Sequence, residues 1–147
     1  MDALFGSGVA QALPAKLDLE FSRRTGRIKN FGIGGQLAAT LRTDGGLALT
    51  VFGAQYLFDN SSAFAENSVS PVEEAIPFVS EGRSLFCKHV NACGSNIKVG
   101  SDVAIVGSSK VIAVGVSLLD AVLMKQYSRG VAVKVREGLA ARAPDKN

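Results

Sequence analysis

The stretch RGVAVKVREG, residues 129–138, decides how the C-terminal half of the chain folds. Its three valines alternate with an alanine and two cations, Lys134 and Arg136, which is the period-two pattern of a strand with one apolar and one basic face. Gly130 and Gly138 bracket the run. We therefore predict a terminal strand whose basic face is either solvated or in contact with an acidic partner.

Composition predicts a folded, soluble chain. Of the 147 residues, 47% are hydrophobic, and the mean hydropathy is +0.22, so a core can be buried and wholesale disorder is not expected. No apolar run reaches the ~18 residues that span a bilayer, and no secretory signal is visible at the N-terminus. We expect a cytoplasmic protein that does not enter a membrane.

Charge is divided unevenly between the two halves. Residues 1–80 hold six Lys/Arg and eight Asp/Glu, whereas residues 81–147 hold ten and five, a net +5. A basic half is typical of proteins that contact a polyanion, although solvated surface lysines give the same count.

The first half predicts a small antiparallel sheet with helices on one face. The turns between its strands are marked by glycines, in RRTGR (23–27), GIGGQ (32–36) and TDGG (43–46). A Gly-rich short helix is expected at residues 3–13, and GAQYLF (53–58) begins a second one. The expected strands are 17–21, 28–33, 37–42 and 47–52.

A Ser-, Asn- and Glu-rich segment, residues 59–76, predicts a domain boundary. Strands are expected beyond it at 84–90, 102–107, 111–119 and 130–137, with one helix, 119–127, capped by Asp120. The predicted fold class is α+β, with a first domain at residues 1–70 and a second at 76–147.

Two motifs suggest chemistry that the rest of the sequence does not support. GGQ (34–36) is the tripeptide of translation release factors, but its place between two strands favours a hairpin turn. Cys87, His89 and Cys93 have a spacing that could suggest zinc, yet a structural zinc site needs four ligands, and Cys87 is expected to be a core thiol. With one histidine and no nucleophile–base arrangement, we expect no metal and no cofactor.

The basic residues are better candidates for function. Arg23, Arg24 and Arg27 surround the first turn, where guanidinium groups can bind phosphates, or simply keep a hairpin tip soluble. Lys88 can extend the basic face of the last strand. Phe78 is a candidate for stacking on an unpaired base, or for packing between the two domains.

The second half resembles a PUA domain, a small RNA-binding β pseudobarrel. Three motifs carry the resemblance: an FxK element at Phe86–Lys88, the run VGVSLL (114–119) before a helix, and RGVAVKVREG. The resemblance implies a PUA-type pseudobarrel as the fold of the second domain.

The first half resembles the domain that precedes the PUA domain in archaeal (archaeosine) tRNA-guanine transglycosylase. RTGRI (24–28), LAATLRTDG (37–45) and LTVFGA (49–54) follow in that family's order. The family's catalytic part, a TIM barrel of ~250 residues with an aspartate nucleophile and a zinc site, has no counterpart in this sequence.

The resemblance implies a tRNA-binding protein that is not an enzyme on its own. We expect the recognition subunit of a split transglycosylase, which grips the tRNA acceptor end while a catalytic partner exchanges guanine for preQ0; no DNA contact is expected. A stand-alone PUA adaptor in rRNA or tRNA maturation, or a small enzyme, are the alternatives. The residues implied for the acceptor end are Phe78, Lys88, Gly130, Lys134 and Arg136, and for backbone phosphates Arg23, Arg24, Arg27 and Arg42.

Overall fold

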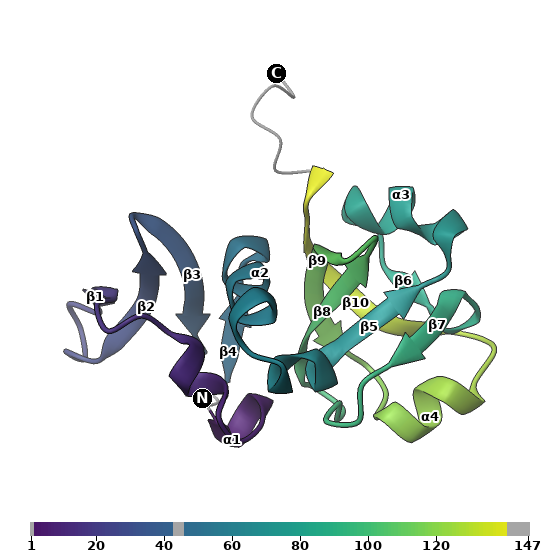
Figure 1. The fold of residues 1–147 in the computed structure, drawn as a ribbon, viewed down its shortest axis with the longest axis horizontal. Coiled ribbons are helices and arrows are strands. Elements are labelled where there is room, and N and C mark those ends of the chain that lie inside the picture. The colour runs from purple at the N-terminus through teal and green to yellow at the C-terminus, as the bar shows by residue number, and fades with distance from the viewer. Residues whose placement is uncertain (1, 43–45, 141–147) are drawn as a thin grey trace.

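The computed structural model describes residues 2–42 and 46–140. Within these residues, two β-sheets lie on either side of a helix (Figure 1). The smaller sheet is antiparallel throughout, with its strands in sequence order. Its strands are β1 (Asp18–Phe21), β2 (Ile28–Ile33), β3 (Gln36–Leu41) and β4 (Leu47–Leu49).

Glycines make the tight turns of this sheet. Gly26 lies in the β1–β2 turn with φ +71°, and Gly34 and Gly35 form the β2–β3 turn with φ +59° and +86°. Two consecutive positive φ angles are those of a type I′ hairpin turn. The GGQ tripeptide is therefore part of a hairpin, as predicted, and the turn predicted at 43–46 lies largely outside the described residues.

Helix α2 (Val51–Asn60) begins earlier than predicted and shortens the strand before it. The Thr50 hydroxyl accepts a hydrogen bond from the Gly53 amide at 3.0 Å, which is a typical N-cap. The expected strand 47–52 is wrong beyond Leu49, because this cap starts a helix at Val51. The N-terminal segment likewise forms two short pieces, α1 (Asp2–Phe5) and η1 (Val9–Ala12).

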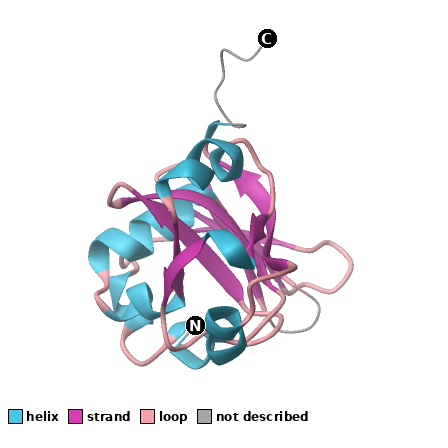
Figure 2. Cartoon of the chain, turned by 90° about the vertical axis from the view of Figure 1, so that its right-hand side faces the viewer, coloured by secondary structure: helices cyan, strands magenta, loops and turns pink. Residues whose placement is uncertain are grey.

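The larger sheet has six strands in the order β6-β10-β9-β8-β5-β7 and curls toward a barrel (Figure 2). Among the strands of the described residues, only β5 and β8 pair in parallel. The predicted class, α+β with an N-terminal antiparallel sheet and a C-terminal pseudobarrel, is confirmed. The strands are β5 (Ser68–Pro71), β6 (Leu85–Phe86), β7 (Val90–Cys93), β8 (Asp102–Gly107), β9 (Lys110–Ser117) and β10 (Val131–Gly138).

Short helices lie around the larger sheet. The strongest helix prediction is confirmed by α4 (Ala121–Gln126), where the Asp120 carboxylate accepts from the Leu123 amide at 2.8 Å. Among the described residues, no helix has the length and apolar character that a membrane crossing requires. The remaining helices are η2 (Ala63–Asn67), η3 (Glu73–Ala75), α3 (Ile76–Ser80) and η4 (Cys87–His89).

The single strand predicted over residues 84–90 is wrong. β6 ends at Phe86, η4 follows, and β7 begins at Val90. The alternating burial that suggested a strand is real, since Leu85 and Cys87 are buried while Phe86 is exposed. A single turn of 3₁₀ helix meets the same burial requirement, and it redirects the chain from one strand to the next.

The segment between the two halves is ordered. It contains η2 and β5, and β5 pairs inside the larger sheet from Ser68 onward. The domain boundary predicted between residues 70 and 76 stays a prediction, with β5 on its N-terminal side.

One hydrophobic core joins the two sheets through α2. Ala54 and Leu57 of α2 pack with Phe31 of the smaller sheet and with Val111 and Val114 of the larger one. A second core fills the larger sheet around Leu85, Ile105 and Met124. Helix α2 thus lies between the sheets, as Figure 1 shows.

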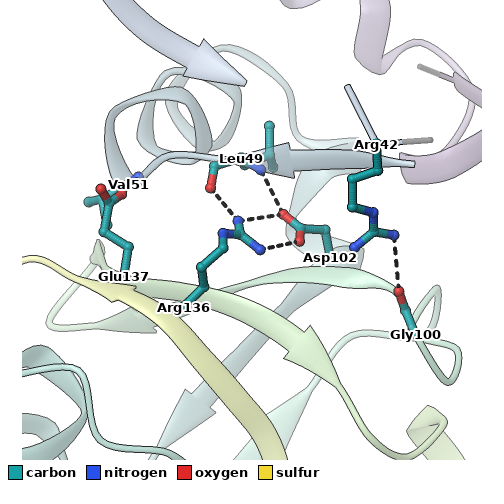
Figure 3. A network of polar contacts seen from close by, with 7 residues as sticks. All are labelled: Arg42, Leu49, Val51, Gly100, Asp102, Arg136 and Glu137. Atoms are coloured by element: carbon teal, nitrogen blue, oxygen red, sulfur yellow. Dashed lines mark hydrogen bonds and ion pairs between the residues drawn. The ribbon is translucent and has the colours of Figure 1, made fainter. Parts of the chain in front are cut away.

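A polar contact reinforces this junction (Figure 3). The Arg136 guanidinium binds both carboxylate oxygens of Asp102, at 2.8 and 3.2 Å, and also donates to the Leu49 carbonyl. Asp102 in turn accepts from the Leu49 amide at 2.8 Å, and Glu137 accepts from the Val51 amide at 2.7 Å. We call Arg136, Asp102, Leu49, Glu137 and Val51 the inter-sheet clamp.

Candidate nucleic-acid interface

An open hollow of about 290 Å³ lies between α3 and η4. Two aromatic rings line it, Phe78 from α3 and Phe86 from β6, and their side chains are 53% and 45% exposed. A single exposed ring is common on protein surfaces, but exposed apolar side chains that share one hollow are typical of binding sites. We call this site the aromatic hollow; its lining residues are Ala75, Phe78, Val79, Arg83, Ser84, Phe86 and His89.

The end of α3 places a cation against one of these rings. Gly82 adopts φ +105°, so the chain turns back, and the Arg83 amide donates to the Phe78 carbonyl at 3.1 Å. This turn brings the Arg83 guanidinium to 5.7 Å from the centre of the Phe78 ring, within the range of a cation–π contact. The pair presents a flat apolar face and a positive charge together.

Gly130 opens the edge next to the hollow. Its carbonyl accepts from the Cys87 amide at 2.9 Å, so it lies against η4 at the start of β10. Its φ is +87°, and a Cβ built on it meets no atom within 4 Å. A side chain there would be strained and would fill this open space, so glycine leaves the backbone accessible to a ligand. Lys88, the exposed central residue of η4, follows Cys87.

The lining of the hollow contains one cation, Arg83, and no carboxylate. The acidic residues nearest in sequence, Glu73, Glu74 and Glu81, do not line it. Cys87, the first residue of η4, is buried, and burial raises the pKa of its thiol, so the thiol stays neutral near pH 7. This arrangement suits an anion with an aromatic part.

The structure divides the nine predicted RNA-contact residues into three groups. Phe78 lines the aromatic hollow, and Lys88 and Gly130 lie next to it. Arg23, Arg24 and Arg27 are exposed at the β1–β2 turn, at the opposite end of the molecule in Figure 1. The other three lie on or near the junction between the sheets.

The structure shows what surrounds those three residues. Arg136 belongs to the inter-sheet clamp, so its guanidinium already binds a carboxylate. Half-buried Arg42 donates to the Gly100 carbonyl at 3.5 Å. Lys134 is exposed, but it pairs with Val116, which pairs with Asp102, so it shares the clamp's face of the sheet. Their contacts with RNA stay predictions.

Sequence reasoning missed Arg83 and did not place Phe86 and His89 in this site. The alternation over residues 84–90 put Phe86 on the face opposite Leu85 and Cys87, and the FxK motif contains it, but neither signal indicated a hollow. Arg83 gave none, because its place over Phe78 depends on the turn at Gly82. Among the described residues, no three His, Cys, Asp or Glu side chains are grouped so that they could hold a metal ion. Of the three residues weighed as zinc ligands, His89 lines the aromatic hollow, Cys87 is buried, and the Cys93 thiol points to the Ala121 carbonyl at 3.7 Å.

Comparison with known proteins agrees with this architecture. Residues 2–63 match the patch-forming domain C2 of tRNA-guanine transglycosylase, and residues 72–139 match the PUA domain. The chain is 35% identical over 140 residues to the tRNA-guanine(15) transglycosylase of Methanothermobacter thermautotrophicus, across 93% of this chain and 21% of that protein. The Thermococcus onnurineus protein of the same name is 34% identical, across 92% and 23%.

Solved structures show the same fold. A hypothetical protein of Pyrococcus horikoshii OT3 matches 99% of this chain and 86% of its own, with a TM-score of 0.71 and 23% identity. A PUA domain from Aeropyrum pernix K1 matches 87% and 73%, with a TM-score of 0.65 and 19% identity. The chain spans about a fifth of the length of the curated relatives it matches. It combines a C2 domain of the tRNA-guanine transglycosylase type with a PUA domain, in the arrangement that the archaeal transglycosylases share.

Proposed function

We propose that this chain binds tRNA at its acceptor end and serves as the recognition subunit of an archaeosine-type tRNA-guanine transglycosylase. The aromatic hollow holds the unpaired end of the RNA, with Lys88 and Gly130 beside it. A catalytic partner carries out the exchange of guanine for preQ0 elsewhere on the same tRNA. This chain contributes orientation of the substrate and no covalent step.

The aromatic hollow is the observation that carries this proposal. RNA duplexes are recognised mainly by shape and by phosphate and 2′-OH contacts, whereas unpaired bases stack on aromatic side chains and arginine planes. Phe78 and Phe86 offer such faces, and Arg83 adds a charge over one of them. An end that joins a duplex to an unpaired strand therefore fits this site better than a continuous duplex.

The relatives support the choice of tRNA. The proteins that match nearly the whole chain carry the name tRNA-guanine(15) transglycosylase. In our proposal, the arginines of the β1–β2 turn reach backbone phosphates at a second place on the same RNA, because they lie at the far end of a body held together by α2 and the inter-sheet clamp.

A binding measurement across salt concentrations tests the first part of the proposal. Contacts with phosphates release counterions, so the logarithm of the affinity should fall linearly with the logarithm of the salt concentration. We expect a slope of several units for tRNA, and a loss of affinity when the single-stranded 3′ end is removed. Affinity that ignores both salt and the 3′ end would overturn acceptor-end binding.

A reconstitution tests the second part. We expect this protein to increase base exchange by a transglycosylase catalytic chain that lacks its own C2 and PUA domains, and to have no exchange activity alone. Exchange by the isolated protein would make it an enzyme. Tight tRNA binding without any effect on the catalytic chain would instead favour a stand-alone adaptor.

A further inference from the structure

A second hollow, of about 380 Å³, lies on the other side of η4. Its chemistry resembles that of the aromatic hollow, since it also has an exposed ring, Tyr127, and an exposed cation, Lys125. We call it the Tyr127 hollow; its lining residues are Cys87, Val90, Asn91, Ala92, Cys93, Met124, Lys125 and Tyr127.

Lys125 is the one charged side chain among the lining residues of the Tyr127 hollow. Two thiols, of Cys87 and Cys93, also line it, and burial raises the pKa of both. Both thiols therefore stay protonated near pH 7. The Lys125 ammonium is the charge of this lining, and it also lies close enough to Glu66 to help lower the pKa of that carboxyl. The Asn91 side-chain amide adds a hydrogen-bond donor and acceptor to the lining.

Residues of η4 and of the strands that flank it line both hollows. Along the chain, Phe86 and His89 line the aromatic hollow, while Cys87 and Val90 line the Tyr127 hollow. Exposed Lys88 lies on this turn, and Gly130 leaves open space beside it. One strand of RNA can therefore pass from one hollow to the other beside the Lys88 side chain.

We infer that the Tyr127 hollow is a second nucleotide subsite, which takes an unpaired nucleotide of the same RNA strand that occupies the aromatic hollow. In this subsite the base stacks on the Tyr127 ring, the Lys125 ammonium binds a phosphate, and Asn91 contacts the edge of the base. The inference rests on the proposed function, and it adds that the protein holds a stretch of single strand and not only one terminal base.

Hairpin RNAs with 3′ single-stranded tails of zero to four nucleotides test this directly. For the unmodified protein we expect affinity, measured by fluorescence anisotropy, to rise at more than one step of tail length. Tyr127→Ala should remove one part of this gain and Phe78→Ala another. Each substitution should lower the affinity for tailed RNA by about 5-fold or more, as expected for the loss of one stacked base. The double variant should lose both parts and keep only the smaller preference for tailed hairpins that Phe86 and the cations supply.

Conservative and neighbouring variants separate stacking from a structural role. Tyr127→Phe should keep the gain, because the ring remains. Val122→Ala, on the same α4 helix and 63% exposed, should behave like the unmodified protein. Lys125→Gln should reduce the salt slope for tailed RNA by about 0.7, the value for one phosphate contact of a single strand, and should leave blunt RNA unchanged.

The outcomes distinguish this inference from the proposed function. If Phe78→Ala loses its part of the gain while Tyr127→Ala keeps all of it, the second subsite is excluded and the acceptor-end site stands. If tails add nothing to binding by the unmodified protein, both fail. An equal loss for tailed and blunt RNA in Tyr127→Ala would also overturn the subsite, because it would show a general effect on the fold.

Discussion

Arg136 and Asp102 form a bidentate ion pair, with 2.8 Å between Nη1 and Oδ1, between β10 and β8. The Asp102 side chain is 2% exposed and that of Arg136 is 35% exposed. Both also bind the backbone of Leu49 in the smaller sheet. A residue pair inside the PUA domain therefore fixes the position of the C2 domain, and the two candidate RNA-binding ends of the molecule keep one relative position.

Replacement of Arg136 by Ala should destabilise the fold by about 1–3 kcal/mol. The Asp102 carboxylate would remain buried without its charged partner, which carries the desolvation cost of an unpaired group. Urea denaturation measures the change in the free energy of unfolding. Lys134→Ala is the matched control, since this exposed cation lies two residues earlier in β10, and we expect a change within about 0.5 kcal/mol. Equal stability of the two variants would show that the clamp is dispensable.

Gly53→Ala in α2 should destabilise the protein, although alanine favours helices by about 1 kcal/mol over glycine. A Cβ at this position would overlap the Ala38 carbonyl and backbone, so α2 would have to move away from β3. Overpacking of this kind costs about 1–3 kcal/mol. Thermal unfolding should show a lower Tm. A higher Tm would mean that the helix propensity of alanine outweighs the overlap with Ala38, and that α2 can move away from β3 without loss of stability.

Acid should weaken the contact between η2 and the loop before β8. The Glu66 carboxylate accepts hydrogen bonds from the Ser95 amide at 2.9 Å and its hydroxyl at 2.8 Å, and these bonds lower the pKa of Glu66. Because the pKa of Glu66 is lower in the folded state than in the unfolded state, its ionised carboxylate stabilises the fold. This stabilisation is fully present above the ordinary pKa of glutamate, about 4. It is lost as the pH falls through the lower pKa of the folded state.

A pH series of unfolding curves checks this effect. Between about pH 5 and pH 3, Glu66→Gln should lose less stability than the unmodified protein. Asp2, whose pKa is lowered by the Ala10 and Gly8 amides, should contribute independently in the same direction, so Asp2→Asn is a parallel variant. Identical acid dependence in all three proteins would contradict a role of these hydrogen bonds.

Salt dependence should identify the cation that acts beside the aromatic hollow. Lys88 is exposed on η4, and we expect Lys88→Gln to lower the slope of log affinity against log salt for tRNA by about one unit. Lys110→Gln, an exposed lysine at the start of β9, is the control and should leave the slope unchanged. The same slope in both variants would remove Lys88 from the interface.

The fold was largely predictable because its strands follow local rules. Strand β8 agrees with its expected bounds, and the hairpin at Gly34 and Gly35 follows from the need for two positive φ angles. The strand expected over 84–90 failed for a nonlocal reason. Cys87 hydrogen-bonds to Gly130, 43 residues away, and a single turn there satisfies the same alternation of buried and exposed residues.

The site was predictable only in part. Phe78, Lys88 and Gly130 were expected from the sequence, and they come together around η4. Arg136 lies at a position where the alternating pattern of the last strand predicts an exposed cation. Its partner Asp102 is 34 residues away, and no local sequence pattern reveals such a pairing. Arg83 acquires its place over Phe78 through the turn at Gly82, which depends on three-dimensional geometry.

The comparison of Phe78→Ala, Phe86→Ala and Phe21→Ala in tRNA binding tests the central claim most directly. Phe78 and Phe21 are 53% and 54% exposed, so truncation removes a similar exposed ring, but Phe21 lies on β1 at the other end of the molecule. We predict that Phe78→Ala and Phe86→Ala each weaken binding by about 1–3 kcal/mol, while Phe21→Ala binds like the unmodified protein. Equal affinity of all four proteins would contradict acceptor-end recognition by the aromatic hollow.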